Sequence, residues 1–334
     1  MKGVVLAAGY GSRLLPLTSF RPKSMLPVAG KPILHHSLEY LQEECDIKEV
    51  IIVVGYQRNA IMDYFKNGQE FGLDISYVVQ RFDQTRGLAA ALNLVADRIN
   101  NDFVVLLGDN LFSANLKSVI DMHLSSDASA TLQIEENPDP SRYGVVEIEG
   151  DNILGVEEKP KHPKSNYCIT GFYVFSPVIF NTFSGLQPSA RGEYELSDSI
   201  QALIDKEYGV KAVKMEGWRH DIGYPEDLLL VNQHYLNNET HTVLGEVINS
   251  TINPPVYIGK ECIVQDSIIG PYVMIENGVE VTNTELKNSV ILEKSKISRS
   301  LISDSVIGTN SKVDGLKAHS LKVGDYSVIS NGTI

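Results

Sequence analysis

Cysteine, tryptophan and long apolar runs are scarce in this chain. Its 334 residues include three cysteines and one tryptophan. Cys45, Cys168 and Cys262 are odd in number and far apart, without a CxxC pair or a Cys/His cluster, so we expect three reduced thiols and no zinc site. No stretch approaches the roughly 20 apolar residues of a membrane helix, and the first apolar run is too short for a signal peptide. We therefore expect a cytoplasmic protein without a membrane partner.

Positive charge is also in deficit. The chain has 29 Lys and Arg against 42 Asp and Glu, a formal net charge of −13. A general nucleic-acid binder needs a basic face for phosphates, so nucleic acid is not an expected partner, although a local basic cluster could hold a small anion. At 43% apolar and 21% charged residues the composition is that of an ordinary globular protein. The length predicts one large domain or two.

The first 236 or so residues alternate short apolar runs with segments of helical periodicity. Such alternation predicts an α/β domain with a mostly parallel, Rossmann-like sheet covered on both faces. Pro32 suits the first turn of a helix, where its missing N–H would be unpaired anyway. The candidate strands are 4–8, 50–54, 75–79 and 103–107, and the candidate helices start at Pro32 and near Gln57, Gly87 and Ala114.

The pattern changes after residue 240, where aliphatic side chains recur every five or six residues. A plain antiparallel β domain would show period-two alternation with irregular turns, so we favour a parallel β-helix, whose short strands stack their inward aliphatics. At roughly 18 residues per coil we expect about three to four coils. The predicted boundaries are 1–238 for the first domain, 239–250 for a linker and 251–334 for the β-helix. The recurring positions are Ile252, Ile258, Val264, Ile269, Ile275, Val281, Leu286, Ile291, Ile297, Ile302, Ile307 and Val313.

A glycine-rich turn, Gly9-Tyr10-Gly11-Ser12-Arg13, follows the first candidate strand. Such a turn lets backbone N–H groups close on phosphate oxygens. A dinucleotide-binding G-x-G-x-x-G motif is not met, because Leu14 stands at the third glycine position. The G-K-[ST] ending of a Walker A loop is also absent. Because Arg13 and Lys23 lie on the same segment, two cations could reach one triphosphate, and we favour phosphate binding.

The stretch from Leu6 to Pro32 resembles the signature of the sugar-1-phosphate nucleotidylyltransferases. It matches L-A-A-G-x-G-[ST]-R-L-x-P-x-T and then P-K-x-x-L-P-V-x-x-K-P. The C-terminal repeat is similar to the left-handed β-helix of hexapeptide repeats in many members. The resemblance therefore covers essentially the whole chain. Later segments in the family's order are Leu106-Leu107-Gly108-Asp109-Asn110, Glu157-Glu158-Lys159-Pro160, Gly192-Glu193-Tyr194-Glu195-Leu196 and Trp218-Arg219-His220-Asp221-Ile222-Gly223.

The resemblance implies that a sugar-1-phosphate oxygen attacks the α-phosphorus of a nucleoside triphosphate in line and releases pyrophosphate. Positioning and charge neutralisation then carry catalysis. Arg13 is expected on the triphosphate and Lys23 on the α-phosphate, while Asp109 and Asp221 are expected to ligate Mg²⁺. His220 is expected to be structural, because the nucleophile is already an anion. The nucleotide is expected to contact Leu6, Ala8, Gly9, Gly11, Ser12, Gln80 and Gly87.

On the sugar side, the resemblance places Glu158 on sugar hydroxyls and Lys159 on the sugar phosphate, with Gly144 and Ile169 lining the pocket. Ile169 stands where members that bind N-acetylglucosamine often have Asn, which disfavours an N-acetylated substrate. Gln80 is expected to pair with a pyrimidine, and Gln84 is the competing candidate. One methyl separates thymine from uracil and is worth at most about 1–3 kcal/mol, so dTTP and UTP both stay candidates, and use of both would be unsurprising.

The leading hypothesis is thus a thymidylyl- or uridylyltransferase acting on glucose 1-phosphate. Mannose-1-phosphate guanylyltransferase is the alternative favoured by the segment from Asp221 to Pro225 and by the β-helix, and N-acetylglucosamine-1-phosphate uridylyltransferase is another. A non-catalytic nucleotide-sugar sensor would typically have lost Arg13, Lys23, Asp109 or Asp221, and all four are present. We expect the β-helix, whose one histidine is His319, to serve oligomerisation or regulation without a second active site, in a homo-oligomer.

Overall fold

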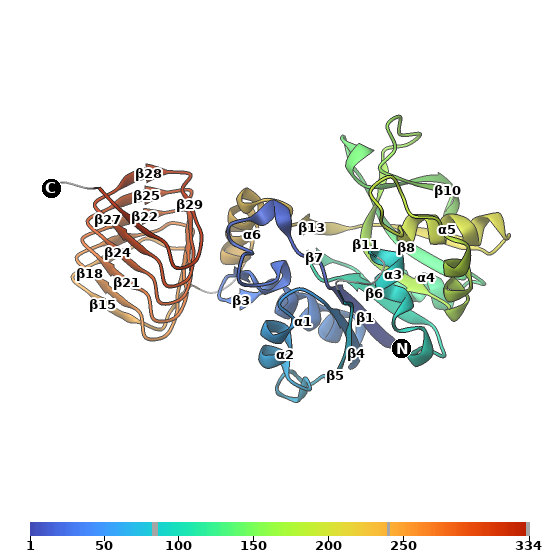
Figure 1. Cartoon of the computed structure of the whole chain (residues 1–334), viewed down its shortest axis with the longest axis horizontal. Coiled ribbons are helices and arrows are strands. Elements are labelled where there is room, and N and C mark those ends of the chain that lie inside the picture. The colour runs from blue at the N-terminus through green and yellow to red at the C-terminus, as the bar shows by residue number, and fades with distance from the viewer. Residues whose placement is uncertain (82–85, 239–240, 332–334) are drawn as a thin grey trace. The chain divides into compact units, whose positions relative to one another are not determined.

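The computed structural model describes residues 1–81, 86–238 and 241–331. The chain forms two compact units: Met1–Gly9 with His36–Arg219, and Tyr10–His35 with His220–Ile334. Each unit is described by itself, with the elements labelled in Figure 1. None of the helices in the described residues is both long and apolar enough to cross a membrane.

The first unit is built on a nine-stranded sheet in the order β5-β4-β1-β6-β11-β8-β12-β10-β9. Its first four strands are parallel neighbours, as the apolar runs predict, and the helices that follow them begin within a few residues of the predicted starts. The first of these helices begins at Ile33, because Pro32 lies in a short strand instead. The bounds are β1 (Lys2–Ala7), β4 (Glu49–Val54), β5 (Asp74–Val79), β6 (Phe103–Leu107), α1 (Ile33–Cys45), α2 (Arg58–Phe65), α3 (Leu88–Asn93) and α4 (Lys117–Leu124).

The rest of the sheet mixes parallel and antiparallel pairing. Strand β11 runs antiparallel to both β6 and β8, and β12 runs parallel to β8. A small separate sheet pairs β7 with β13. The bounds are β7 (Asn110–Ala114), β8 (Ala130–Glu136), β9 (Gly144–Glu149), β10 (Asn152–Glu158), β11 (Tyr167–Phe175), β12 (Val210–Lys214), β13 (Gly217–Asp221) and α5 (Leu196–Asp205), with 3₁₀ segments at Gln69–Phe71, Ala96–Arg98, Pro140–Arg142 and Pro177–Gly185.

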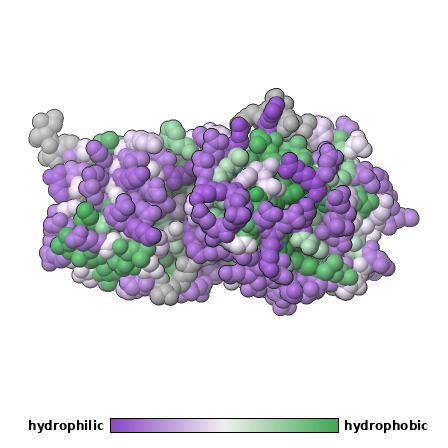
Figure 2. All heavy atoms as spheres, turned by 90° about the horizontal axis from the view of Figure 1, so that it is seen from below, coloured by the Kyte–Doolittle hydropathy of each residue, from purple (hydrophilic) through white to green (hydrophobic). Residues whose placement is uncertain are grey.

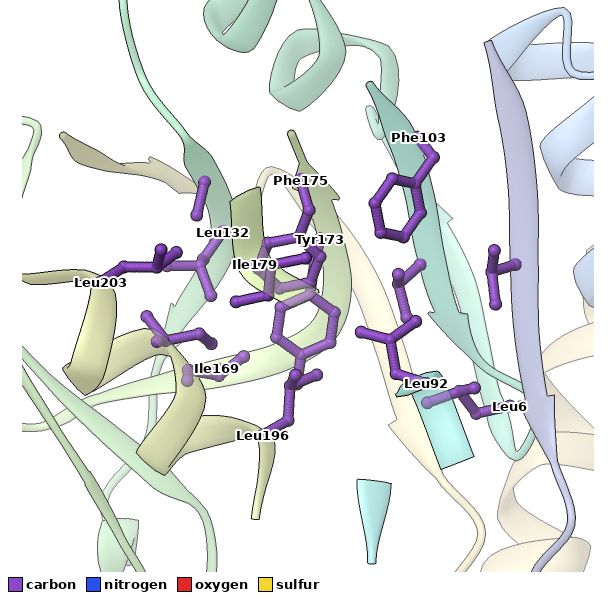
Figure 3. Packing of buried hydrophobic residues seen from close by; sticks show 14 of the residues in the cluster. Leu6, Leu92, Phe103, Leu132, Ile169, Tyr173, Phe175, Ile179, Leu196 and Leu203 are labelled. Carbon is purple, nitrogen blue, oxygen red and sulfur yellow. The ribbon is translucent and has the colours of Figure 1, made fainter. Parts of the chain in front are cut away.

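One apolar core joins the two halves of this sheet (Figure 3). Phe103 on β6 and Phe175 on β11 are fully buried, with ring centroids 6.1 Å apart. Leu196 and Leu203 on α5 close the same core from outside the sheet. The core therefore holds the ends of β1, β6 and β11 in fixed positions, and these ends carry candidate site residues.

The second unit combines the signature segment, which we define as residues 10–35, with α6 (Pro225–Asn238) and the β-helix. The signature segment contains two 3₁₀ turns, Ser12–Leu14 and Lys23–Met25, and a hairpin of β2 (Pro27–Val28) and β3 (Lys31–Pro32). Asn232 on α6 is fully buried and accepts a hydrogen bond from the Ala29 N–H at 3.1 Å. This bond fixes the hairpin tip against α6.

The β-helix stacks parallel strands in three sheets. Eleven of the twelve predicted inward aliphatics are buried, and Ile252 is partly buried. The first sheet comprises β14 (Thr242–Val243), β17 (Val256–Ile258), β20 (Val273–Ile275), β23 (Ser289–Ile291), β26 (Val306–Ile307) and β29 (Lys322–Val323). The second comprises β15 (Glu246–Ile248), β18 (Ile263–Gln265), β21 (Glu280–Thr282), β24 (Lys296–Ser298), β27 (Lys312–Asp314) and β30 (Val328–Ser330). The third comprises β16 (Thr251–Ile252), β19 (Ile268–Ile269), β22 (Glu285–Lys287), β25 (Leu301–Ser303) and β28 (Lys317–His319).

The repeated tetrapeptides form corners of this β-helix. Asp266, Asn288 and Asp304 adopt positive φ, which Asn and Asp tolerate better than most residues. The serine that follows each of them is buried, and its Oγ accepts an amide N–H from the next coil, as Ser267 does from Thr284 at 3.1 Å. The tetrapeptides are therefore explained by corner geometry.

The expected number of coils is wrong. In the part of the chain that the structure describes, two six-stranded sheets and one five-stranded sheet give five complete coils and part of a sixth. Corresponding positions are 16 or 17 residues apart, fewer than the 18 expected, and pairing already begins at Thr242 in β14. Strands β14 and β15 lie within the 239–250 segment treated above as a linker, and the boundaries at 238 and 251 stay predictions.

The face of the β-helix seen in the left part of Figure 2 is mostly polar, with apolar groups between. Exposed apolar side chains on its strands include Ile263, Ile268 and Leu301.

All three cysteines are buried and free, and burial raises the pKa of Cys45 to about 12 and of Cys168 to about 11. Neither of these two thiols would be ionised near neutral pH.

Gly30 at the hairpin tip packs directly on the β-helix. It adopts a φ of +87°, and a Cβ there would lie 2.2 Å from a ring carbon of Tyr257. We expect Gly30→Ala to lower the free energy of unfolding by about 2 kcal/mol, the usual scale of overpacking, measured by denaturant unfolding. Gly185→Ala is the matched control, because a Cβ there meets nothing within 4 Å. An equal loss in both variants would contradict the packing at Gly30.

Candidate active site

Several predicted nucleotide-binding residues lie at the carboxyl edge of the parallel strands. Ala8 and Gly9 follow β1, Gln80 follows β5 and Asp109 follows β6 after one glycine. The Gly108 N–H donates to the Leu6 carbonyl at 3.0 Å, and the Gln80 N–H donates to the Val54 carbonyl at 2.8 Å. Because the strands are parallel neighbours, their ends share one edge, where α/β sheets usually bind ligands. The first unit thus gathers Leu6, Ala8, Gly9, Gln80 and Asp109 at that edge.

The backbone around Gly87 leaves no room for a side chain. It precedes α3 with a φ of +107°, and a Cβ would lie 2.3 Å from the Tyr194 carbonyl oxygen. The Tyr194 N–H donates to the Arg86 carbonyl and the Ala89 N–H donates to the Tyr194 carbonyl. Close backbone approach therefore accounts for glycine here, and a role in nucleotide binding stays a prediction. Gln84, the competing candidate for base pairing, lies outside the described residues.

The four predicted sugar-side residues are close together in the first unit. Gly144 on β9 pairs with Glu158 on β10. A Cβ at Gly144 would lie 3.2 Å from Cδ1 of Ile169 and 3.3 Å from Oε2 of Glu158. Nζ of Lys159 lies 3.2 Å from Oε1 of Glu158. The carboxylate of Glu158, the ammonium group of Lys159 and the backbone of Gly144 therefore lie next to one another.

Two further polar residues that the sequence reasoning missed lie at Glu158. Ser197 donates to Oε2 of Glu158 at 2.5 Å, and Arg191 lies 3.6 Å from Oε1. Arg191 also donates to the buried Glu195 at 2.8 Å. Both residues flank the quoted Gly192–Leu196 motif, which was the available signal. Arg191 also lies 3.3 Å from Glu193, so its guanidinium is shared among three carboxylates.

Arg219 binds three residues of the first unit, one of them next to Asp109. Its side chain is only 5% exposed and makes an ion pair with Glu135 at 2.5 Å. It also donates to Oδ1 of Asn110 at 2.7 Å and to the Thr170 carbonyl at 3.1 Å. Asn110 directly follows Asp109. One guanidinium thus holds the side chain of the residue next to Asp109.

In the second unit, the signature segment places Lys23 against Asp221. The Lys23 side chain is 11% exposed, and its Nζ lies 2.9 Å from Oδ1 of Asp221. Gly11 adopts a φ of +70°, its carbonyl accepts from Thr18 at 2.9 Å, and a Cβ there would lie 3.1 Å from Cβ of Lys23. Only glycine therefore fits this turn without displacing Lys23.

Arg13 and Ser12 lie on the exposed side of the same turn. The Arg13 guanidinium carbon lies 5.5 Å from the centroid of the Tyr224 ring, a distance at which a cation is attracted by the ring face. Tyr224 follows Asp221 by three residues. The second unit therefore brings Gly11, Ser12, Arg13, Lys23 and Asp221 into one neighbourhood.

His220 lies beside Asp227, and its expected structural role stays a prediction. Its Nε2 lies 3.2 Å from Oδ1 of Asp227, whose other oxygen accepts from the Gly223 and Tyr224 N–H groups at 2.8 and 2.7 Å. Burial alone would raise the pKa of Asp227, but these hydrogen bonds outweigh it and lower the pKa. The ionised Asp227 holds the turn that follows Asp221.

Comparison with known proteins decides the family. The family model described as nucleotidyl transferase matches residues 2–238. The chain belongs to this family. The UTP–glucose-1-phosphate uridylyltransferase AglF of Haloferax volcanii is 44% identical over 68% of this chain and 93% of its own length. The glucose-1-phosphate thymidylyltransferase of Streptomyces antibioticus is 33% identical over 98% of this chain and 99% of its own length.

A solved structure agrees with these relatives. UDP-glucose pyrophosphorylase complexed with UDP-glucose matches 71% of this chain and 99% of its own chain, with 28% identity and a TM-score of 0.64. The membership of the sugar-1-phosphate nucleotidylyltransferases that the signature indicates is confirmed. The nucleotidyltransferase domain and the parallel β-helix are confirmed as well.

Proposed function

We propose that this nucleotidyltransferase moves a nucleotidyl group from dTTP or UTP to glucose 1-phosphate, giving dTDP-glucose or UDP-glucose and pyrophosphate. The names of the two relatives support this substrate pair. The observation that carries the proposal is that Arg13 on the glycine turn, Lys23 on the next 3₁₀ turn and Asp221 at the end of β13 lie in one neighbourhood of the second unit. Two cations and one carboxylate there suit a triphosphate with its counter-ion.

Each cation has a distinct task in the proposed reaction. Exposed Arg13 neutralises the departing pyrophosphate, while Lys23, held by Asp221, neutralises charge on the α-phosphate and the attacking oxygen. The sugar-phosphate oxygen forms the new bond to the α-phosphorus as the bond to pyrophosphate breaks. No proton has to move, because the attacking oxygen is already an anion. Preorganised charge of this kind is usually the largest catalytic contribution.

We further propose Asp109 and Asp221 as ligands of Mg²⁺. Among the described residues there is no group of three or more His, Cys, Asp or Glu side chains that could enclose a metal ion. Mg²⁺ typically takes one or two carboxylates and substrate phosphates rather than a protein cage, and Asp109 in the first unit and Asp221 in the second each offer a ligand of this kind. When bound, the ion supplies charge neutralisation on the phosphates. Lys23 occupies one oxygen of Asp221, which orients that carboxylate.

On the sugar side we propose that Glu158 accepts from sugar hydroxyls, with Ser197 fixing the carboxylate. Lys159 then binds the sugar phosphate. Leu6, Ala8, Gly9, Gly11, Ser12 and Gly87 are proposed to contact the nucleotide, and Gln80 to pair with the pyrimidine. A homo-oligomer and a cytoplasmic location also stay predictions.

The deciding experiment measures pyrophosphate release with Mg²⁺ over a grid of nucleoside triphosphates and sugar 1-phosphates. We expect turnover to concentrate at dTTP or UTP with glucose 1-phosphate, and EDTA to abolish it. Turnover only with GTP and mannose 1-phosphate would mean that Gln80 is assigned wrongly. No turnover in any combination, with nucleotide still bound, would indicate a sensor in place of an enzyme.

A further inference from the structure

Arg21 lies in the signature segment between the two proposed catalytic cations, and its side chain points into the β-helix. Its guanidinium donates to Oγ1 of Thr309 and, at 3.1 Å, to Oδ2 of Asp325. The Arg21 side chain is 17% exposed and that of Asp325 only 2%. Neither residue belongs to the sugar or nucleotide groups described above. This ion pair joins positions 304 residues apart.

The partners of Arg21 form a column of acidic and polar groups at one corner of the β-helix. Asp325 and Thr309 each follow a strand of the first sheet by two residues, as does Glu293, and Glu276 is one residue after β20. The pKa of Glu276 is raised to about 7, because burial and the neighbouring carboxyl groups of Glu293 and Asp325 outweigh Arg21 and a hydrogen bond from the Glu293 N–H. Asp325 is buried and paired with Arg21, so removing the guanidinium leaves that carboxylate without its counter-charge.

Other contacts tie the same segment to successive coils. The Gly30 N–H lies 3.3 Å from Sδ of Met274, beside the contact with Tyr257. Phe20 meets Tyr326 edge to face, with centroids 5.6 Å apart. A Cβ at Gly324 would lie 2.9 Å from Cβ of Pro16. The signature segment therefore contacts the β-helix at points from Pro16 to the hairpin tip at Gly30.

We propose that the β-helix is a brace for the signature segment and that Arg21 is a positioning residue, which holds Arg13 and Lys23 in place through Asp325 and Thr309. The role of the two cations rests on the proposed function. The brace itself rests on the contacts above. The 3₁₀ turn Lys23–Met25 begins two residues after Arg21, so a shift of Arg21 passes directly to Lys23.

The test compares Arg21→Met, Arg21→Lys and Arg299→Met by hydrogen exchange and by steady-state kinetics. Arg299 pairs with Asp314 on the exposed surface of the β-helix and is the matched control. For Arg21→Met we expect exchange of amides in residues 10–35 to rise at least about tenfold, since a buried pair is lost, while the β-helix keeps its protection. We also expect kcat/KM to fall about tenfold, with Arg21→Lys between it and the wild type.

Unchanged exchange in residues 10–35, or an equal rise in Arg299→Met, would overturn the brace. If Arg21→Met does not fold, the double variant Arg21→Met with Asp325→Asn removes the uncompensated charge and must show the same local rise. Exchange is measured without substrate, so it decides on the brace even where the wild type shows no turnover. Increased exchange in residues 10–35 with unchanged kcat/KM would refute Arg21 as a positioning residue.

Discussion

Asp109→Asn is expected to lower kcat for pyrophosphate release at least about 10²-fold, the scale of removing one preorganised electrostatic group. The substitution keeps the shape of the side chain and removes its charge at the carboxyl edge of β6. Under the proposed function this weakens the site for Mg²⁺, so the Mg²⁺ concentration that gives half-maximal rate should rise as well. Both quantities come from one titration of rate against Mg²⁺.

Asp102→Asn is the matched control for this variant. Asp102 directly precedes β6 at its other end, where its carboxylate lies 3.6 Å from Nε2 of His123. The same chemical change at that end should leave kcat within about twofold, because a partly exposed pair contributes little. Near-normal turnover in Asp109→Asn would remove Asp109 from the metal site.

Arg219→Met is expected to lower the free energy of unfolding by about 3 kcal/mol, because it leaves the partly buried Glu135 without its counter-charge. Methionine replaces most of the apolar stem, so the loss comes mainly from the broken pair and from the bond to Asn110. Denaturant unfolding measures the effect. The exposed pair Lys296–Glu280 gives the comparison, where Lys296→Met should cost less than about 1 kcal/mol.

A second substitution separates the effect of Arg219 on stability from its effect on the position of Asn110 beside Asp109. In Arg219→Met with Glu135→Leu an apolar pair replaces the ion pair, which is often neutral for stability, so most of the lost free energy should return. Turnover should stay low, because Asn110 beside Asp109 still lacks its donor. Full recovery of kcat together with stability would show that Arg219 contributes only to folding.

The strands and the β-helix core were predicted from the sequence because each depends on the spacing of apolar residues within a short stretch of chain. Apolar runs such as 103–107 form strands at the expected residues, and the aliphatic repeat marks the β-helix core. The sugar-side group came from the family resemblance and not from a local pattern, and its members Gly144 and Glu158 meet through the antiparallel pairing of β9 and β10, whose register shifts between Ile153 and Gly155.

What the sequence did not reveal depends on contacts across the fold. Arg191 reaches Glu158 and Arg219 reaches Glu135 only after strands far apart in the chain have paired. The coil number was underestimated because the first strands, at Thr242–Val243 and Glu246–Ile248, precede the regular aliphatic spacing. A strand of two or three residues is recognised only by its pairing with a strand of the next coil.

The spacing of the coils sets a length for the signature segment. Gly30 contacts the coil of Tyr257, and Arg21 contacts the coil of Asp325, four strands further along the same sheet. At about 4.8 Å between neighbouring strands, the coils contacted by Gly30 and by Arg21 are about 19 Å apart, and the β-helix fixes this distance. A coil inserted or deleted between these two points would put one anchor out of reach of the other, whereas coils added beyond Asp325 would not. Coils can therefore be added to this domain after Asp325 without changing the distance between the two contacts.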